Sequence, residues 1–181
     1  MALKATIFKA DLHIADMDRS YYHDHSITLA RHPSETDERM MVRLLAFSLN
    51  ANDDLAFGKG LSTDNEPALW QKDLTGAIEL WIDVGTPDER DIRKACSRAR
   101  QVIVYCYGRN ADLWWEQNRN KLDRLKNLSV FNLPVNATQA LAKLAQRTMR
   151  VQSTVQDSVI WLGDDNDRIE VTPITLKSTL P

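Results

Sequence analysis

Two acidic residues on a predicted β-hairpin are spaced so that they could form a metal-binding site. The hairpin consists of two strands, residues 66–73 and 76–85, joined by the turn formers D-L-T-G. If the turn closes on the middle two residues, Glu66 lies directly opposite Asp83, with Cβ atoms about 4.5–5.5 Å apart. Asp73 is interpreted as a turn residue, because Asp often bonds the neighbouring backbone in turns.

The opposed carboxylates of Glu66 and Asp83 need a partner, since like charges this close destabilise a strand pair unless a cation, a shared proton or an arginine joins them. Carboxylate oxygens are ligands suited to Mg²⁺ or Mn²⁺. Such an ion would activate water and neutralise the charge that develops on a phosphodiester. The alternative is a solvated hairpin edge whose acids pair with arginines, and a one-residue change of register would also separate the two side chains.

A third acid, Glu38, lies on a predicted helix over residues 34–50. Ser34 is the expected N-cap, and Asp37 takes the acid position of a capping box. Glu38 projects along the edge of the apolar stripe formed by Met41, Leu44, Leu45 and Leu49, so it could point towards a sheet as a metal ligand. Glu35 is a weaker candidate. The alternative role of Glu38 is to complement the helix dipole from the first turn.

The composition is that of a soluble globular protein. The chain has 181 residues, of which 43% are hydrophobic and 27% charged, enough for one domain spanning residues 1–181. The absence of a signal peptide or of an apolar run of about 20 residues predicts a cytoplasmic location. A net charge of −2 argues against broad non-specific nucleic-acid binding, although basic residues cluster over 90–100 and 119–126. Cys96 and Cys106 are expected to be small core residues.

The remaining pattern predicts an α/β fold with a mixed central sheet flanked by helices. A nearly continuous apolar run at 102–108 is typical of a strand covered on both faces. The other predicted elements are strands 3–13 and 19–31, a loop at 50–65, helix 86–101 with Pro87 in its first turn, helix 111–127, strand 128–134, helix 136–146 capped by Asn136, and two or three strands within 147–177.

Four sequence blocks together resemble the YaeQ family of bacterial proteins. They are HPSETDERMMVRLLAF, EPALW, TGAIELWIDVGTPDERDIRKACSRA and VYCYG, and the resemblance extends from about residue 5 to residue 175. It implies a PD-(D/E)XK restriction-endonuclease-like core with additional β-strands at both termini. The order of elements above agrees with such a core.

The resemblance also implies roles for individual residues. Glu38 matches the acid on the first core helix, Glu66 stands at the first motif acid, and Asp83 matches the acid of (D/E)XK. Gly85 departs from the motif lysine. Some members of that superfamily carry the lysine on the following helix, where Lys94 is the natural substitute and Arg93 lies behind it.

Lys94 lies about 140° around its helix from the apolar stripe of Ile92, Ala95 and Ala99. A solvated basic helix face is therefore the alternative to a catalytic lysine, although a long side chain can bend back.

Two functions are consistent with these features. The first is a metal-dependent nuclease-like enzyme that acts on nucleic-acid phosphodiesters, with Mg²⁺ or Mn²⁺ held by Glu38, Glu66 and Asp83 and with Glu66, Asp83 and Lys94 as the catalytic set. The second is a catalytically inactive nuclease-fold protein that acts as a nucleic-acid- or protein-binding regulatory module, because Gly85 removes the in-motif lysine. Neither function involves a membrane, and both leave the oligomeric state open.

Overall fold

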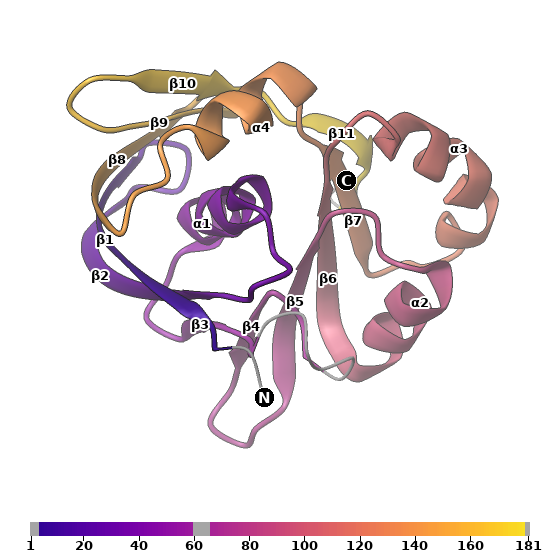
Figure 1. Ribbon diagram of the computed structural model, residues 1–181. Coiled ribbons are helices and arrows are strands. Elements are labelled where there is room, and N and C mark those ends of the chain that lie inside the picture. The colour runs from indigo at the N-terminus through magenta and orange to yellow at the C-terminus, as the bar shows by residue number, and fades with distance from the viewer. Residues whose placement is uncertain (1–3, 60–65, 180–181) are drawn as a thin grey trace. The chain divides into compact units, whose positions relative to one another are not determined.

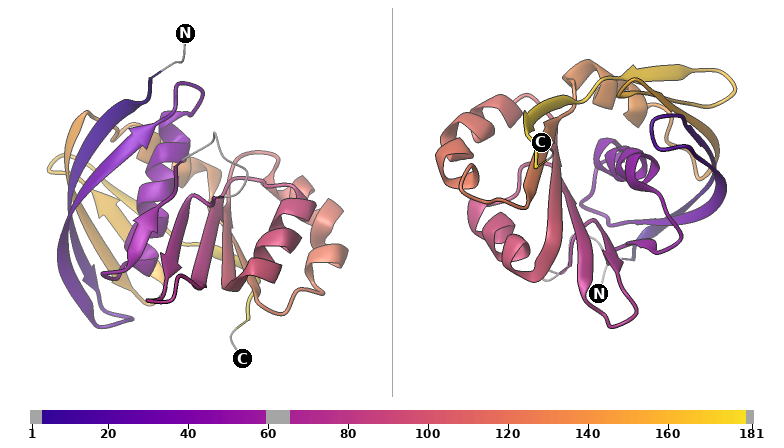
Figure 2. Two further views of the ribbon diagram at one scale, coloured as in Figure 1. Left: turned by 90° about the horizontal axis from the view of Figure 1, so that it is seen from below. Right: turned by 180° about the vertical axis from the view of Figure 1, so that it is seen from behind.

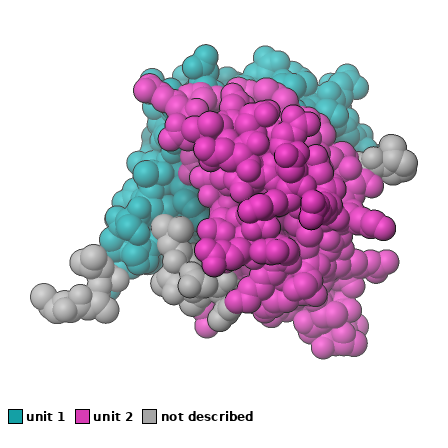
Figure 3. All heavy atoms as spheres, turned by 90° about the vertical axis from the view of Figure 1, so that its right-hand side faces the viewer, with its two compact units in different colours: residues 1–51, 136–173 teal, residues 52–135, 174–181 magenta. Residues whose placement is uncertain are grey.

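A computed structural model of the chain describes residues 4–59 and 66–179 and shows an α/β protein with two mixed sheets. By its internal contacts the chain divides into two compact units, one formed by residues 1–51 and 136–173 and the other by residues 52–135 and 174–181 (Figure 3). The prediction of one domain over residues 1–181 stays a prediction. Among the described residues, no helix has the length and apolar character needed to cross a membrane.

Unit 1 contains a five-stranded sheet that curves around helix α1 (Asp37–Asn50) (Figures 1 and 2). The strand order is β10-β9-β8-β1-β2; β1 pairs with β8 in parallel and the other pairs are antiparallel. The strands are β1 (Thr6–Asp16), β2 (Tyr21–Arg31), β8 (Thr148–Gln156), β9 (Val159–Gly163) and β10 (Arg168–Val171). The predicted N-terminal hairpin is therefore confirmed.

The helix α1 differs from its prediction at its start and in its burial. Its N-cap is Thr36, whose side chain accepts a hydrogen bond from the amide of Arg39, so the prediction of Ser34 as the cap is wrong. Every residue from Met40 to Ser48 is buried. The helix is thus enclosed on all sides, where the sequence predicted a single apolar stripe.

Arg43, in the middle of α1, forms a buried ion pair with Glu35 in the segment before the helix and a hydrogen bond to the end of β2. The Arg43 side chain is 2% exposed and its Nε donates to Oε1 of Glu35 at 2.8 Å, while Nη2 donates to the carbonyl of Ala30 at 3.2 Å. Burial lowers the pKa of the Arg43 guanidinium, and the Glu35 carboxylate acts in the opposite direction. Glu35 is committed to this pair, so it is not a ligand candidate.

Unit 2 contains a six-stranded sheet in the order β11-β7-β6-β5-β4-β3. The central strands β5, β6 and β7 are parallel, and β3–β4, β4–β5 and β7–β11 pair antiparallel. The strands are β3 (Leu55–Phe57), β4 (Leu69–Lys72), β5 (Ile78–Val84), β6 (Ala99–Cys106), β7 (Leu128–Asn132) and β11 (Ile174–Lys177). Strand β6, predicted as a strand covered on both faces, lies between two parallel neighbours, β5 and β7.

Several predicted boundaries need correction. The chain from residue 147 onwards holds four strands, β8 to β11, where two or three were expected. Strand β3 lies in the segment predicted as a loop over 50–65, of which residues 60–65 lie outside the described residues. Asn136 was expected to cap the fourth helix but is its second residue, because α4 spans Val135–Ala142.

Helices α2 (Glu89–Arg98) and α3 (Ala111–Leu122) lie on the same face of the unit 2 sheet (Figure 1). Helix α2 is capped by Asp88, so Pro87 precedes it instead of standing in its first turn. The core between these helices and the sheet includes Trp81, Ile92 and Cys106. Trp81 alternates with Asp83 on β5, and so the face of β5 that carries Asp83 is covered by helices.

Both cysteines are free, and Cys106 is a buried core residue as predicted. Burial raises the pKa of the Cys106 thiol to about 12. It also raises the pKa of the half-buried Cys96 thiol, to about 11. Both groups are therefore protonated and unreactive at neutral pH.

Loss of the Arg43 guanidinium should strongly destabilise the protein. In an Arg43→Leu variant the buried Glu35 carboxylate loses its closest partner and keeps only the 3.5 Å ion pair with Arg39, so the expected loss is about 3–5 kcal/mol in the free energy of unfolding. Urea denaturation measures it. Arg90, whose side chain is 82% exposed, provides the control, and Arg90→Leu should change stability by less than about 0.5 kcal/mol. A loss at position 43 no larger than the loss at position 90 would contradict a structural role for the pair.

Candidate metal-binding site at the end of strand β5

The β4–β5 hairpin has a register different from the predicted one. Leu69 pairs with Ile82, and beyond this pair the amide of Ala68 donates to Oδ1 of Asp83 at 3.4 Å. The prediction that Glu66 lies directly opposite Asp83 is therefore wrong. Ala68 occupies that place, and Glu66 lies further along the chain towards the N-terminus.

Two local features of the hairpin cause this shift. The amide of Asp73 donates to the carbonyl of Ala77 at 2.9 Å, so the loop is longer than the predicted two-residue turn. Beyond it, Lys72 pairs with Ile78 and the register then slips at Glu79, which forms a bulge. The Asp73 carboxylate accepts backbone hydrogen bonds within the loop, which confirms Asp73 as a turn residue.

The Asp83 carboxylate is held by the buried core of unit 2. Its Oδ2 accepts a 2.8 Å hydrogen bond from Nε1 of Trp81, whose exposed fraction is 4%. The guanidinium carbon of Arg98 lies 5.2 Å from the centroid of this indole ring. Because the indole cannot move without disturbing the core, the orientation of the carboxylate is fixed. This contact is not predicted from the sequence, although the two residues share one face of the strand.

Glu66 is half-buried and approaches the same end of the hairpin. Its Oε2 accepts a 2.9 Å hydrogen bond from the amide of Lys59. Glu66 is two residues from Ala68, so their Cα atoms are at most about 7 Å apart. Gly58 allows its segment of the chain to lie close to the segment of Glu66 and Pro67, because a Cβ at position 58 would lie 2.0 Å from the carbonyl oxygen of Pro67.

Glu38 belongs to unit 1, whereas Glu66 and Asp83 belong to unit 2. The Glu38 side chain is half-buried, and its Oε2 accepts a 3.0 Å hydrogen bond from Oγ1 of Thr138 on α4. Within residues 4–59 and 66–179, no three His, Cys, Asp or Glu side chains form a group that could hold a metal ion. The structure therefore brings two of the predicted acids to one end of a hairpin and places the third in the other unit.

Gly85, which follows strand β5, has a backbone conformation that disfavours the lysine of the predicted motif. Its amide donates to the carbonyl of Tyr105 on β6 at 2.9 Å, and its φ is +95°. Residues with a side chain are strained in this region. A lysine at position 85 would therefore conflict with the backbone, even though the space for its Cβ is open.

The two predicted substitutes for that lysine lie on α2. Arg93 forms an ion pair with Glu89 one turn earlier, with Nε and Oε1 3.4 Å apart. Lys94 is exposed, on the side of the helix away from the buried Ile92 and Ala95. In the described part of the chain, no hydrogen bond or ion pair joins Arg93 or Lys94 to Glu66 or Asp83. The acids and the bases are thus positioned by different elements.

Known proteins resemble the chain over nearly its whole length. A family model described as YaeQ protein matches residues 1–173. The relative named "Uncharacterized protein YaeQ" in Escherichia coli (strain K12) is 49% identical over 172 residues, which cover 94% of this chain and 95% of the relative. The protein of the same name in Salmonella typhi is 47% identical over 172 residues, which cover 94% of this chain and 95% of that protein.

Two crystal structures of YaeQ proteins have the same fold. The structure from Xanthomonas axonopodis pv. citri is 50% identical, covers 96% of this chain and 99% of its own, and has a TM-score of 0.93. The structure from Pseudomonas syringae is 35% identical with the same TM-score and covers 96% and 97% of the two chains.

The conformation of Gly85 leads to a stability prediction. A Gly85→Ala variant should lose about 1–2 kcal/mol in the free energy of unfolding, because alanine is strained at this φ. The matched control is Thr86→Ala, next in the chain and at no positive φ, with an expected change below about 0.5 kcal/mol. Chemical denaturation of both variants measures the difference; equal stability would show that the backbone at position 85 accepts a side chain freely.

Proposed function

The chain belongs to the YaeQ family, and on this premise we propose that it is a metal-dependent phosphodiesterase of the PD-(D/E)XK nuclease-like type that acts on nucleic acid. The observation that carries the proposal is the Asp83 carboxylate, fixed by Trp81 and Ala68 where β5 ends. The carboxyl ends of parallel strands are where ligands of α/β sheets commonly bind.

The donor atoms at this end of the hairpin fit a hard divalent cation. Asp83 offers Oδ1, whose contact with the Ala68 amide is long at 3.4 Å, and Glu66 uses Oε2 to accept from Lys59. A carboxylate has about four lone-pair directions, so one that accepts a hydrogen bond can also be a ligand of a cation. Mg²⁺ is often held by one or two carboxylates together with water and substrate phosphates. Two acids, Asp83 and Glu66, are therefore sufficient.

The residues of the chain have separate roles in this proposal. A bound Mg²⁺ or Mn²⁺ supplies Lewis acidity and an activated water. The Trp81 indole keeps the Asp83 carboxylate in one orientation, which is the precondition for a defined ligand geometry. Lys94 is the only residue of the proposed set that carries positive charge, and its long side chain would stabilise the charge on the phosphate in the transition state.

A second candidate function is a catalytically inactive nuclease-fold protein that binds nucleic acid or another protein. The observation that favours it is the left-handed backbone at Gly85, which excludes the motif lysine, together with the exposure of Lys94. The acids would then be retained for binding or for structure.

Cleavage assays test the first function. Purified protein should cleave single- or double-stranded DNA or RNA in the presence of Mg²⁺ or Mn²⁺, and EDTA should abolish cleavage. Asp83→Asn should lower the rate by more than about 100-fold, since an amide is a poor ligand for these ions. The control Asp91→Asn changes an exposed acid on α2 and should leave the rate unchanged. The proposal fails if the wild type cleaves none of these substrates or if Asp83→Asn cleaves as fast as it does.

Lysine variants separate the two functions. If Lys94 is the relocated lysine, Lys94→Met should reduce the cleavage rate by about 100-fold through lost charge stabilisation, with metal affinity unchanged. Lys121→Met removes an exposed lysine from α3 and serves as the matched control. Nucleic-acid binding without cleavage, and with the same affinity in both variants, would support the regulatory module.

A further inference from the structure

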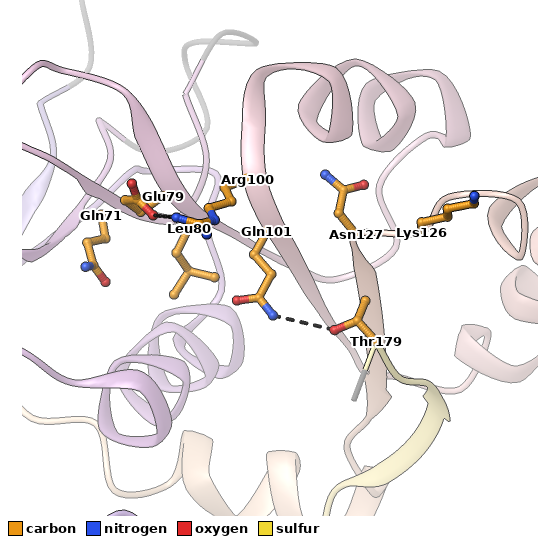
Figure 4. A pocket seen from close by; sticks show the side chains of 8 residues that line it. All are labelled: Gln71, Glu79, Leu80, Arg100, Gln101, Lys126, Asn127 and Thr179. Carbon is orange, nitrogen blue, oxygen red and sulfur yellow. Dashed lines mark hydrogen bonds and ion pairs between the residues drawn. The ribbon is translucent and has the colours of Figure 1, made fainter. Parts of the chain in front are cut away.

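A polar hollow of about 550 Å³ lies in unit 2 at the amino-terminal edge of the parallel strands (Figure 4). This edge is at the other end of β5 from Asp83. Seven of its eight lining residues are polar or charged, and the lining consists of Gln71, Glu79, Leu80, Arg100, Gln101, Lys126, Asn127 and Thr179. No residue of the proposed metal site takes part in it.

One side of the hollow is a row of side chains from three neighbouring strands. Gln71 on β4 pairs with Leu80 on β5, and Leu80 pairs with Gln101 on β6. Paired residues point to the same face of a sheet, and Figure 4 shows these three side chains on one side of it. The row therefore places the apolar side chain of Leu80 between the carboxamides of two glutamines, whose Cα atoms are about 10 Å apart.

The two carboxamides keep unused hydrogen-bonding groups. Oε1 of Gln71 accepts from Nδ2 of Asn52 at 2.8 Å, which leaves the NH₂ group of Gln71 as a donor. Nε2 of Gln101 donates to Oγ1 of Thr179 over 3.5 Å, which leaves Oε1 of Gln101 as an acceptor. In the described part of the chain neither free group has another partner. The row thus offers a donor and an acceptor on either side of Leu80.

Positive charge lies at the same edge of the sheet, with Arg100 next to Gln101 on β6 and so on the opposite face from the row of Gln71, Leu80 and Gln101. Arg100 is 81% exposed and its one ion pair, with Glu79, spans 3.5 Å, so most of its N–H groups are available. Lys126 is exposed just before β7. Asn127 donates both Nδ2 protons, to the carbonyls of Cys96 and Ala99, which fixes its amide and leaves Oδ1 as an acceptor. The edge therefore combines fixed acceptors with two cations.

We propose that this hollow binds a 5′-mononucleotide, with the base on Leu80 between Gln71 and Gln101 and the phosphate at Arg100 and Lys126. Carboxamides pair with the donor and acceptor atoms of base edges, and adenine offers an N6 amino donor for Gln101 Oε1 and ring-nitrogen acceptors for the NH₂ group of Gln71. Arginine and lysine are the usual partners of phosphate. Binding needs neither a metal ion nor Asp83, and so it goes beyond the proposed phosphodiesterase activity.

Calorimetric titration of the full chain in EDTA tests this site. The probes are the four ribonucleoside 5′-monophosphates, with ribose 5-phosphate and inorganic phosphate as probes without a base. Adenosine 5′-monophosphate should bind most tightly. Gln101→Leu should weaken its binding by about tenfold or more and change ribose 5-phosphate binding less than twofold. Arg100→Gln should weaken both by a similar factor, because it removes a phosphate contact.

Matched controls make the outcome decisive. Gln117→Leu and Arg90→Gln change exposed residues of α3 and α2 outside the hollow and should leave mononucleotide binding unaltered. The site is refuted if no mononucleotide binds, if ribose 5-phosphate binds as tightly as the mononucleotides, or if the controls weaken binding as much as Gln101→Leu does. Because the titration contains EDTA, loss of cleavage activity cannot produce any of these results.

Discussion

The hydrogen bond from the Trp81 indole to the Asp83 carboxylate joins the core of unit 2 to its candidate site. The indole is packed with Ile92 of α2 and with the central strands β6 and β7, and its Nε1 ends 2.8 Å from Oδ2 of Asp83. The packing of helices on the sheet therefore determines the direction of a carboxylate at the surface end of a strand. The indole N–H is a neutral donor, and its hydrogen bond sets the direction of the carboxylate.

Strand β5 positions both proposed sites. Asp83 stands near its carboxyl end, next to the glycine whose left-handed backbone closes the strand. Glu79 and Leu80 stand near its amino end, at the polar hollow. Glu79 and Asp83 are about 13 Å apart along the strand at the usual rise per residue. Unit 1 is organised around a different constraint, the buried pair of Glu35 and Arg43, which holds α1 to the end of β2.

The sequence predicted most elements because their signals are local. The N-terminal hairpin, the buried strand β6 and the helices all follow from periodicity and turn formers, and the α/β class follows from their order. The register of the β4–β5 hairpin could not be obtained in this way. It depends on the length of the loop after Asp73 and on a bulge at Glu79, and both are set by backbone hydrogen bonds that no residue pattern identifies.

The candidate metal-binding site was predicted only in part, because its geometry also depends on hydrogen bonds that no residue pattern identifies. Asp83 and Glu66 were found because they are acids on one hairpin, but the partner of Asp83 is an indole on its own strand, which sequence reasoning had treated only as a neighbour. Gly85 was seen as a departure from a motif, and its positive φ gives the physical cause. Glu38 is predicted from helical periodicity and from the family resemblance, and neither can show that its carboxylate accepts from Thr138 in unit 1.

The proposed binding of a divalent cation at Asp83 can be followed by titrating Mn²⁺ into the protein and recording the tryptophan indole resonances by NMR. The chain has five tryptophans, and each indole N–H gives a separate resonance. The Trp81 indole donates to Asp83, so its resonance should broaden first and most strongly, and excess Mg²⁺ should restore it. A Trp81 resonance that stays sharp, or five indoles that broaden together, would contradict metal binding at this strand end.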